Sequence, residues 1–349
     1  MSRFLCDEIV SRRTFVSTVV GAACAGAAGG LAAKCGWAAD PPAAPIPPVA
    51  VFSKLYQELK LDFEQSAAVT AEAGLDGIDC AVRAAGEIEP ARAADDMPRY
   101  AEALGKHGVK MLLLTTGILG VDSPNCREIL TTSKKLGIRY YRLGFWPKPA
   151  DASSGKFLAE IKARLKELAP LNRELGVCAL FENHSAPGTK VGGEQPDAAA
   201  RKPSPNQPEA SAGKPPAAGK SSGMAGGDLG ELYEIVKDFD PDQIAVAFDL
   251  GHAMIMHGDE WHVHFERLKA HVKVAYIKDV GRTSRFVPFG QGEFAKSDFF
   301  TLLKRMKYSA PISMHIEYAW APEGKKARAA MVEMLNNSRR QLGDWWERA

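Results

Sequence analysis

The stretch Ala245–Ala253 reads AVAFDLGHA, and it decides how the rest of the chain is interpreted. With Ile244 before it, its first half is an apolar run that predicts a strand buried on both faces. The run ends at Asp249, and His252 follows three residues later. A carboxylate and an imidazole at the C-terminal end of a buried strand are typical of an α/β active site. Taken alone, the stretch fits equally well a structural role, in which Asp249 caps the following helix and His252 packs against it.

The composition is that of a globular protein, because 46% of the 349 residues are hydrophobic and 25% are charged. The formal net charge of +2 does not favour nucleic-acid binding, since proteins that neutralise phosphates are usually visibly basic. Outside the N-terminus, no apolar run approaches the roughly 20 residues that span a bilayer. We therefore expect a small-molecule partner, with neither nucleic acid nor a membrane as a partner.

The first 39 residues have the features of an export signal. Residues 11–16 read SRRTFV, which is the form of a twin-arginine motif, and an Ala/Gly-rich core follows over 15–33. Ala38 and Ala39 offer a cleavage region, and residues 40–48 form a Pro/Ala linker. We expect export by the twin-arginine route to a periplasmic or other extracytoplasmic space, without stable membrane insertion after cleavage. The alternative is an apolar helix with two chance arginines.

Cleavage would leave three cysteines, Cys80, Cys126 and Cys178. Their separations fit neither a disulfide framework nor a zinc site. Cys80 and Cys178 fall inside predicted strands, so we expect them to be small residues of the core.

From residue 49 onward, the chain repeats a short apolar run, a turn and an amphipathic segment. This repeat predicts a (β/α)8 TIM barrel of parallel strands over 49–349. The alternative is a doubly wound open sheet, but its glycine-rich first turn is missing here. The predicted strands are Val49–Phe52, Gly77–Val82, Val109–Thr115, Tyr140–Phe145, Val177–Glu182, Ile244–Asp249, Val272–Ile277 and Ile312–Glu317. The predicted helices include Phe63–Ala73, Met97–His107, Cys126–Leu136, Phe157–Leu175, Trp261–Ala270, Phe299–Met306 and Lys325–Glu347.

Residues 191–227 interrupt this repeat. They consist mostly of Pro, Ala, Gly, Ser and Lys, so they cannot bury enough apolar surface to fold. We expect a disordered low-complexity insertion between the fifth strand and a helix that begins near Leu229. A lid over the barrel mouth is the alternative, but the composition favours a passive tether.

Polar side chains follow the last four predicted strands, and the C-terminal ends of barrel strands converge on one pocket. Burying so many charges is costly unless they are paired, protonated or bound to a cation. The strand ends read FENH (181–184), FDLGH (248–252), YIKD (276–279) and HIEY (315–318). Alternation along each strand places three pairs on common faces: Glu182 with His184, Tyr276 with Lys278, and His315 with Glu317.

In their order, these pieces resemble the xylose isomerase-like TIM-barrel superfamily, which includes sugar and sugar-phosphate isomerases and epimerases, apurinic-site endonucleases and dehydratases. The resemblance covers about residues 49–320 and includes PFGQGE at 288–293. The epimerase branch is the most similar. It implies a divalent cation that is held by a Glu, an Asp, a His and a second Glu from the fifth to the eighth strands.

The resemblance implies that three of these metal ligands are Glu182, Asp249 and Glu317. The histidine ligand does not carry over, because Tyr276 stands at its position. A neutral phenol is a poor ligand for a divalent cation, whereas carboxylates suit Mn²⁺ or Mg²⁺. Two possibilities stay open. Either three carboxylates and water hold Mn²⁺, Mg²⁺ or Zn²⁺, with further help from His184 or His315, or the site has lost its metal.

The resemblance also implies proton transfer at the carbon next to a carbonyl. A cation or Lys278 would polarise the carbonyl, and Glu182 and Glu317 would exchange the proton on opposite faces. A structural ion pair between Lys278 and Asp279 is the alternative for the lysine. The predicted substrate-binding residues are His252, His184, Arg142 and Tyr276.

Three functions therefore stay open. The first is a sugar isomerase or epimerase that acts outside the cytoplasm, where phosphorylated sugars are uncommon. The second is a lyase or hydrolase that uses the same carboxylates on keto-sugars or glycosides. The third is a non-catalytic carbohydrate-binding protein, which the missing histidine would favour.

Overall fold

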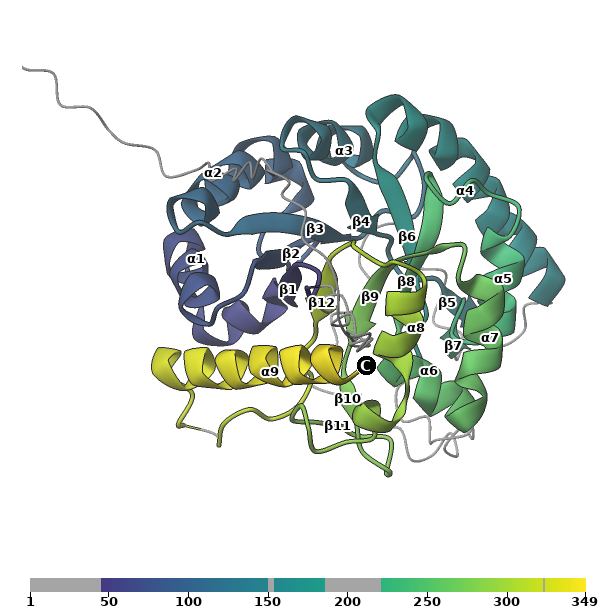
Figure 1. The fold of residues 1–349 in the computed structure, drawn as a ribbon. Coiled ribbons are helices and arrows are strands. Elements are labelled where there is room, and N and C mark those ends of the chain that lie inside the picture. Colours follow the sequence, from purple (N-terminus) through teal and green to yellow (C-terminus); the bar gives the residue numbers. More distant parts are fainter. Residues whose placement is uncertain (1–44, 150–153, 186–220, 323) are drawn as a thin grey trace, which may run out of the picture. The chain divides into compact units, whose positions relative to one another are not determined.

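Parallel strands close into a barrel in the computed structural model, as the sequence predicts (Figure 1). The order around the barrel is β1-β12-β9-β8-β6-β4-β3-β2, and β1 closes it by pairing with both β2 and β12. The strands are β1 (Val49–Phe52), β2 (Gly77–Val82), β3 (Lys110–Thr116), β4 (Tyr140–Arg142), β6 (Cys178–Glu182), β8 (Ile244–Asp249), β9 (Val272–Ile277) and β12 (Ile312–Met314). The predicted fold class is thus confirmed.

The structure describes residues 45–149, 154–185, 221–322 and 324–349. The predicted export signal over 1–39 and most of the predicted insertion lie outside these ranges. All of the described residues belong to one compact unit, Ala43–Ala349.

Helices cover the outside of the barrel (Figure 1). None of the described helices combines the length and the apolar character that crossing a bilayer requires. The helices are α1 (Phe63–Glu72), α2 (Ala93–Lys106), α3 (Cys126–Lys135), α4 (Ser154–Leu175), α5 (Leu229–Val236), α6 (Leu250–His257), α7 (Trp261–Leu268), α8 (Phe299–Arg305) and α9 (Arg328–Arg348). Short 3-10 turns lie at Ser53–Leu59, Pro90–Arg92, Gly258–Glu260 and Phe294–Lys296.

The alternation of side chains along the strands produces two apolar layers. Outward-facing residues pack beneath the helices, and a smaller cluster fills the barrel interior. This inner cluster consists of Ala50, Leu113, Cys178, Leu180, Ala245, Ala247, Val274 and Tyr276. On β6, β8 and β9, the last members of this cluster are followed two residues later by the next inward-facing positions. These positions are Glu182, Asp249 and Lys278. The same period of two that builds the inner core therefore carries charge to its upper end.

Two small antiparallel sheets were not predicted. β5 (Pro147–Pro149) pairs with β7 (Ser221–Met224), and β10 (Asp279–Val280) pairs with β11 (Phe286–Val287). β5 and β7 join the loops that follow β4 and β6, so their pairing depends on a distant contact that no local pattern encodes, whereas β10 and β11 form a hairpin within the loop after β9.

The predicted boundary of the insertion at residue 227 is wrong, because β7 lies inside it and is held by β5. The chain then returns to the end of β6. A Cβ at Gly227 would lie 2.8 Å from the carbonyl oxygen of His184. Only a residue without a side chain fits this approach.

The three described cysteines are free and buried, and for Cys80 and Cys178 this confirms the predicted position in the core.

A close approach between β2 and β3 gives a direct test of the barrel. A Cβ at Gly77 would lie 2.0 Å from the carbonyl oxygen of Lys110 on β3, whereas a Cβ at Gly105 on α2 would have no atom within 4 Å. We expect Gly77→Ala to lower the free energy of unfolding by about 2 kcal/mol or more. Gly105→Ala should raise it by roughly 0.5–1 kcal/mol. Urea unfolding measures both, and equal stability of the two variants would contradict the strand register.

Candidate functional site

The strand ends bring the predicted site residues together around one atom, the Nζ of Lys278. It lies 2.7 Å from Asp249 Oδ2 and 2.8 Å from His252 Nε2. Carboxylate oxygens of Glu182 and Glu317 lie 3.7 Å and 3.6 Å away. Groups that follow β6, β8, β9 and β12 thus meet at the mouth of the barrel, as the sequence predicts.

Lys278 is a buried cation that its neighbours stabilise. Only 1% of its side chain is exposed, and burial by itself would lower its pKa. The carboxylates of Asp249, Glu317 and Glu182 outweigh this effect and raise the pKa above its ordinary value. Lys278 is therefore an ammonium at neutral pH.

The acids around Lys278 differ in their contact with water. Asp249 is fully buried, whereas the side chain of Glu317 is 33% exposed. Burial raises the pKa of Asp249, and the ammonium of Lys278 opposes the rise. For Glu317, the ammonium of Lys278 and the imidazole of His315 outweigh burial and hold the pKa well below its usual range. Glu317 is thus an ionised carboxylate that substrate can reach.

Asp249 has the capping role that the sequence offered as one alternative, and it also forms an ion pair. Its Oδ1 accepts a hydrogen bond from the backbone N–H of His252 at 3.0 Å and caps α6. Its Oδ2 forms the ion pair with Lys278. The side chain of Asn183 also pairs with the backbone N–H and carbonyl of Asp249, both at 2.8 Å. The tip of β8 is therefore held from three directions.

His252 links Lys278 to Ser185. The ammonium can only donate, so His252 Nε2 accepts its hydrogen bond and the ring proton lies on Nδ1. Nδ1 then donates to Ser185 Oγ at 2.8 Å. Burial, together with the neighbouring imidazole of His184 and the charge of Lys278, lowers the pKa of His252 well below its ordinary value. In this state His252 cannot take a proton from Ser185.

His184 stacks close to His252, with 3.9 Å between the ring centroids. Burial and the charge of Lys278 lower its pKa to about 4, so it is neutral at physiological pH. Its Nδ1 lies 2.8 Å from the backbone carbonyl oxygen of Ser185. The uncharged ring of His184 therefore packs beside the charged groups around Lys278.

Arg142 lies against Glu182 at the end of β4. Its Nε is 3.3 Å from Glu182 Oε2, and it donates to the carbonyl of Leu143 at 2.6 Å. Its guanidinium also covers the ring of Phe145 at 4.3 Å. With 3% exposure, Arg142 fixes the orientation of Glu182, so its predicted contact with a sugar stays a prediction.

Asp79 and His315 form a second buried acid–imidazole pair. Asp79 on β2 accepts hydrogen bonds from Thr115 at 2.9 Å and from Ser313 at 3.0 Å. His315 Nε2 lies 3.8 Å from Asp79 Oδ2, too far for a hydrogen bond. Neither ring nitrogen of His315 has a hydrogen-bond partner among the described residues. Asp79 was not predicted as a site residue, although a carboxylate inside the apolar run GIDCAV was a usable signal.

Tyr276 lies fully buried beside this pair, with its ring 4.4 Å from that of His315. It therefore belongs to the floor of the site.

Asp279 does not pair with Lys278, which corrects the structural alternative for that lysine. Its carboxylate instead accepts hydrogen bonds from the backbone N–H groups of Gly290, Gly292 and Phe294, at 2.8, 3.0 and 3.1 Å. A Cβ at Gly292 would lie 2.2 Å from Asp279 Oδ1. The GQG turn is thus a backbone cradle for this carboxylate, because side chains would fill it.

By donor type and distance, two groups of described residues could hold a metal ion. One is Glu182, His184 and His252, and the other is Glu182, Asp249 and His315. Glu317, a predicted ligand, belongs to neither group. In each group, however, one donor already contacts the Nζ of Lys278, at 2.8 Å for His252 and 2.7 Å for Asp249. A divalent ion and this ammonium do not fit the same donors together.

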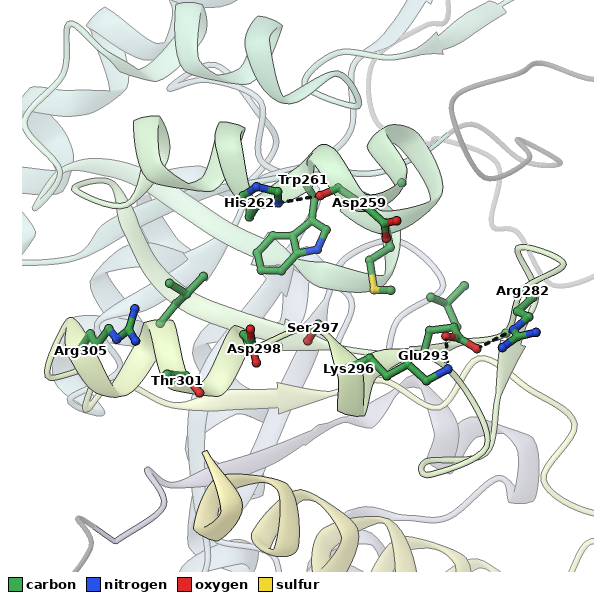
Figure 2. A pocket seen from close by; sticks show the side chains of 15 residues that line it. Asp259, Trp261, His262, Arg282, Glu293, Lys296, Ser297, Asp298, Thr301 and Arg305 are labelled. Carbon is green, nitrogen blue, oxygen red and sulfur yellow. Dashed lines mark hydrogen bonds and ion pairs between the residues drawn. The ribbon is translucent and has the colours of Figure 1, made fainter.

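A separate cavity of about 740 Å³ lies outside the barrel wall, between α6, α7 and α8 (Figure 2). It contains none of the predicted site residues. One of its acids, Glu293, pairs with Arg282 at 3.1 Å and Lys296 at 2.6 Å. The cavity is therefore separate from the cluster around Lys278.

Comparisons with known proteins support the fold. A family model described as a xylose isomerase-like TIM barrel matches residues 213–337. No curated protein matches the chain in sequence.

Among solved structures, the chain is similar to an L-ribulose 3-epimerase, at 13% identity and a TM-score of 0.58, over 87% of this chain and 95% of that one. It is also similar to a 3-keto-D-glucoside 4-epimerase from E. coli, at 11% identity and a TM-score of 0.58, over 84% and 100%. A third is a probable 3-DHS dehydratase from Bacillus anthracis, at 11% identity and a TM-score of 0.55, over 82% and 97%. At these identities the likeness shows the fold alone, which is a TIM barrel.

The cradle around Asp279 predicts a stability effect. Asp279→Asn keeps the shape but turns an N–H donor toward backbone N–H donors. We expect the free energy of unfolding to fall by about 1–3 kcal/mol. The exposed Asp259, substituted in the same way, should stay within about 0.5 kcal/mol of the original chain. Thermal unfolding measures both, and an unchanged Asp279→Asn variant would show that the loop does not need this anchor.

A buried carboxyl behind β2 predicts a pH effect. Burial raises the pKa of Glu87 to about 8, despite hydrogen bonds from Ser53 and Tyr100. Between the unfolded pKa near 4.3 and this value, the folded chain binds more protons than the unfolded chain, so stability falls as pH rises. Glu87→Gln removes this dependence. Its melting temperature, relative to that of the original chain, should increase from pH 5 to pH 8. A constant difference across this range would contradict the raised pKa.

Proposed function

We propose that this chain is a sugar isomerase or epimerase that moves a proton at the carbon next to a carbonyl of a carbohydrate. One observation carries the proposal. The carboxylates of Glu182, at the end of β6, and of Glu317, after β12, both lie within 3.7 Å of the buried ammonium of Lys278. Two proton acceptors thus flank one fixed positive charge.

The arrangement suits enolisation. The carbonyl oxygen of the substrate would accept a hydrogen bond from Lys278, which stabilises negative charge as it develops on that oxygen. One glutamate would remove the proton from the neighbouring carbon, and the second would return a proton from the other side. The ammonium is held in place before substrate arrives, so no reorganisation is needed as the charge forms.

The two glutamates are prepared for different parts of this cycle. Glu317 is the acid that solvent reaches, and its lowered pKa keeps it ionised and ready to act as the base. Glu182 is buried, and Arg142 and Lys278 fix its carboxylate from two sides. The positive charges of Arg142 and Lys278 offset the cost of burying the negative charge of this carboxylate.

The similar structures support a carbohydrate as the substrate, because two of those described above are named as epimerases of a sugar or a keto-glucoside. The predicted twin-arginine leader supports action outside the cytoplasm, where an unphosphorylated sugar is the expected form.

A lyase is the second candidate, because one similar structure is named as a dehydratase. The same proton removal would then be followed by loss of a hydroxyl group. A serine hydrolase is disfavoured, because His252 directs its proton toward Ser185 and cannot activate it.

Deuterium exchange tests the proposal without knowledge of the product. In D₂O, the chain should introduce deuterium next to the carbonyl of a ketohexose or a 3-keto-glycoside, as followed by NMR. Glu317→Gln should slow the exchange by about 10²-fold or more, since general base catalysis typically contributes this much. The same spectra separate an epimerase from a lyase, which would also lose a hydroxyl group.

The exposed Glu174, which pairs with Arg127 on the outside, supplies a matched control. Glu174→Gln should exchange deuterium at the original rate. Full exchange by Glu317→Gln, with its melting temperature unchanged, would rule out Glu317 as the base. Absence of exchange on every keto-sugar, combined with saturable sugar binding, would favour the non-catalytic alternative.

A further inference from the structure

We propose that the ammonium of Lys278 is the resident cation of this site and that it excludes a divalent metal ion from the carboxylates. The metal-binding part of this inference stands on the geometry alone. Its catalytic consequence, that Lys278 supplies the positive charge for the reaction, rests on the function proposed above.

The surroundings of Lys278 Nζ are those of a cation site. Three carboxylates and one imidazole, from Glu182, Asp249, Glu317 and His252, lie within 3.7 Å of this atom. These are the donors that a divalent ion would use. The nearest, Asp249 Oδ2 at 2.7 Å and His252 Nε2 at 2.8 Å, are at the distances of charge-assisted hydrogen bonds.

The two candidate metal groups cannot be used while Lys278 stays in place. Their donor atoms lie within 4.8 Å of one another, and both groups include Glu182. The first needs His252 and the second needs Asp249, and Lys278 contacts both. A bound ion would therefore lie beside the ammonium and compete with it for Glu182 and for either His252 or Asp249.

The protein holds Lys278 in this position by packing. The side chain is 1% exposed, and the ring of Phe286 on β11 covers its ammonium at 5.4 Å. On the other side, a Cβ at Gly251 would lie 3.0 Å from the Cβ of Lys278 and 3.2 Å from the ring of Phe286. The glycine of the DLGH motif thus lets α6, β9 and β11 close around the lysine.

The position two residues before Lys278 also lacks a metal ligand. Tyr276 is fully buried, and its ring lies against the imidazole of His315. A neutral phenol does not compete for divalent ions. Position 276 therefore provides no metal ligand, and the next inward-facing position of the strand, Lys278, provides a positive charge.

Metal titration tests the inference. The chelator-treated chain should bind no Mn²⁺ in the barrel up to about 1 mM, and its melting temperature should change by less than about 1 °C. Lys278→Gln removes the ammonium and leaves the carboxylates. It should bind one Mn²⁺ per chain and gain about 5 °C or more when the ion is present at a hundredfold excess over Kd. Electron paramagnetic resonance counts the bound ion.

Lys273 on the same strand is the matched control, because it is charged but pairs with Asp242 outside the barrel at 3.2 Å. Lys273→Gln should bind no ion in the barrel. If Lys278→Gln does not fold, the original chain still decides the question. One Mn²⁺ per chain that is lost in Asp249→Asn would overturn the inference, and no such ion would support it.

Failure of this inference is distinguishable from failure of the proposed function. A metal-free chain without deuterium exchange would leave the inference standing and remove the function. A chain that binds one ion in the barrel and exchanges deuterium would do the reverse. Lys278→Gln that folds but gains no ion would also overturn the inference, because the ammonium would then not be what excludes the metal.

Discussion

The buried ion pair between Lys278 and Asp249 is the constraint on which the site depends. Removing one partner of such a pair leaves an uncompensated charge in the interior, at a cost of several kcal/mol. Around this pair, Glu182 needs the same ammonium and also Arg142, and Asp79 is satisfied by two hydroxyls. Each charge is thus tolerated because of its neighbours. The site must be understood as one network, in which single substitutions have effects that do not add.

Residues outside the cluster give this network its rigidity. Asn183 ties the ends of β6 and β8 together through the backbone of Asp249, and Asp279 holds the 288–294 turn beside β10. Both are next to reactive residues in sequence but direct their polar atoms at the backbone. The motifs FENH and YIKD therefore each combine one residue for the pocket with one for the scaffold. This division explains why a short motif can be dense in charge without every charge facing the substrate.

The barrel could be predicted from the sequence because its strands are local apolar runs. β1, β2, β8 and β9 begin and end at the predicted residues. The convergence of Glu182, Asp249, Lys278 and Glu317 followed from strand ends alone. What escaped prediction depends on distant partners, as in the pairing of β5 with β7 and the role of Asp79. The individual contacts of Lys278 escaped too, since the sequence places the lysine in the pocket but does not show which of four acidic or basic neighbours it contacts.

The close approach of Gly227 to His184 has a consequence for how this protein can vary and be altered. The chain leaves the barrel just after β6 and comes back to the same point before α5. Because loop-closure entropy grows slowly with length, the barrel sets no tight limit on the number of residues between these points. The junction between the end of β6 and Gly227 is therefore a suitable site for insertions and for new chain termini. A shortened linker, a fluorescent reporter or an entire foreign domain could be grafted there, and new chain termini could be opened there, with the strand order untouched.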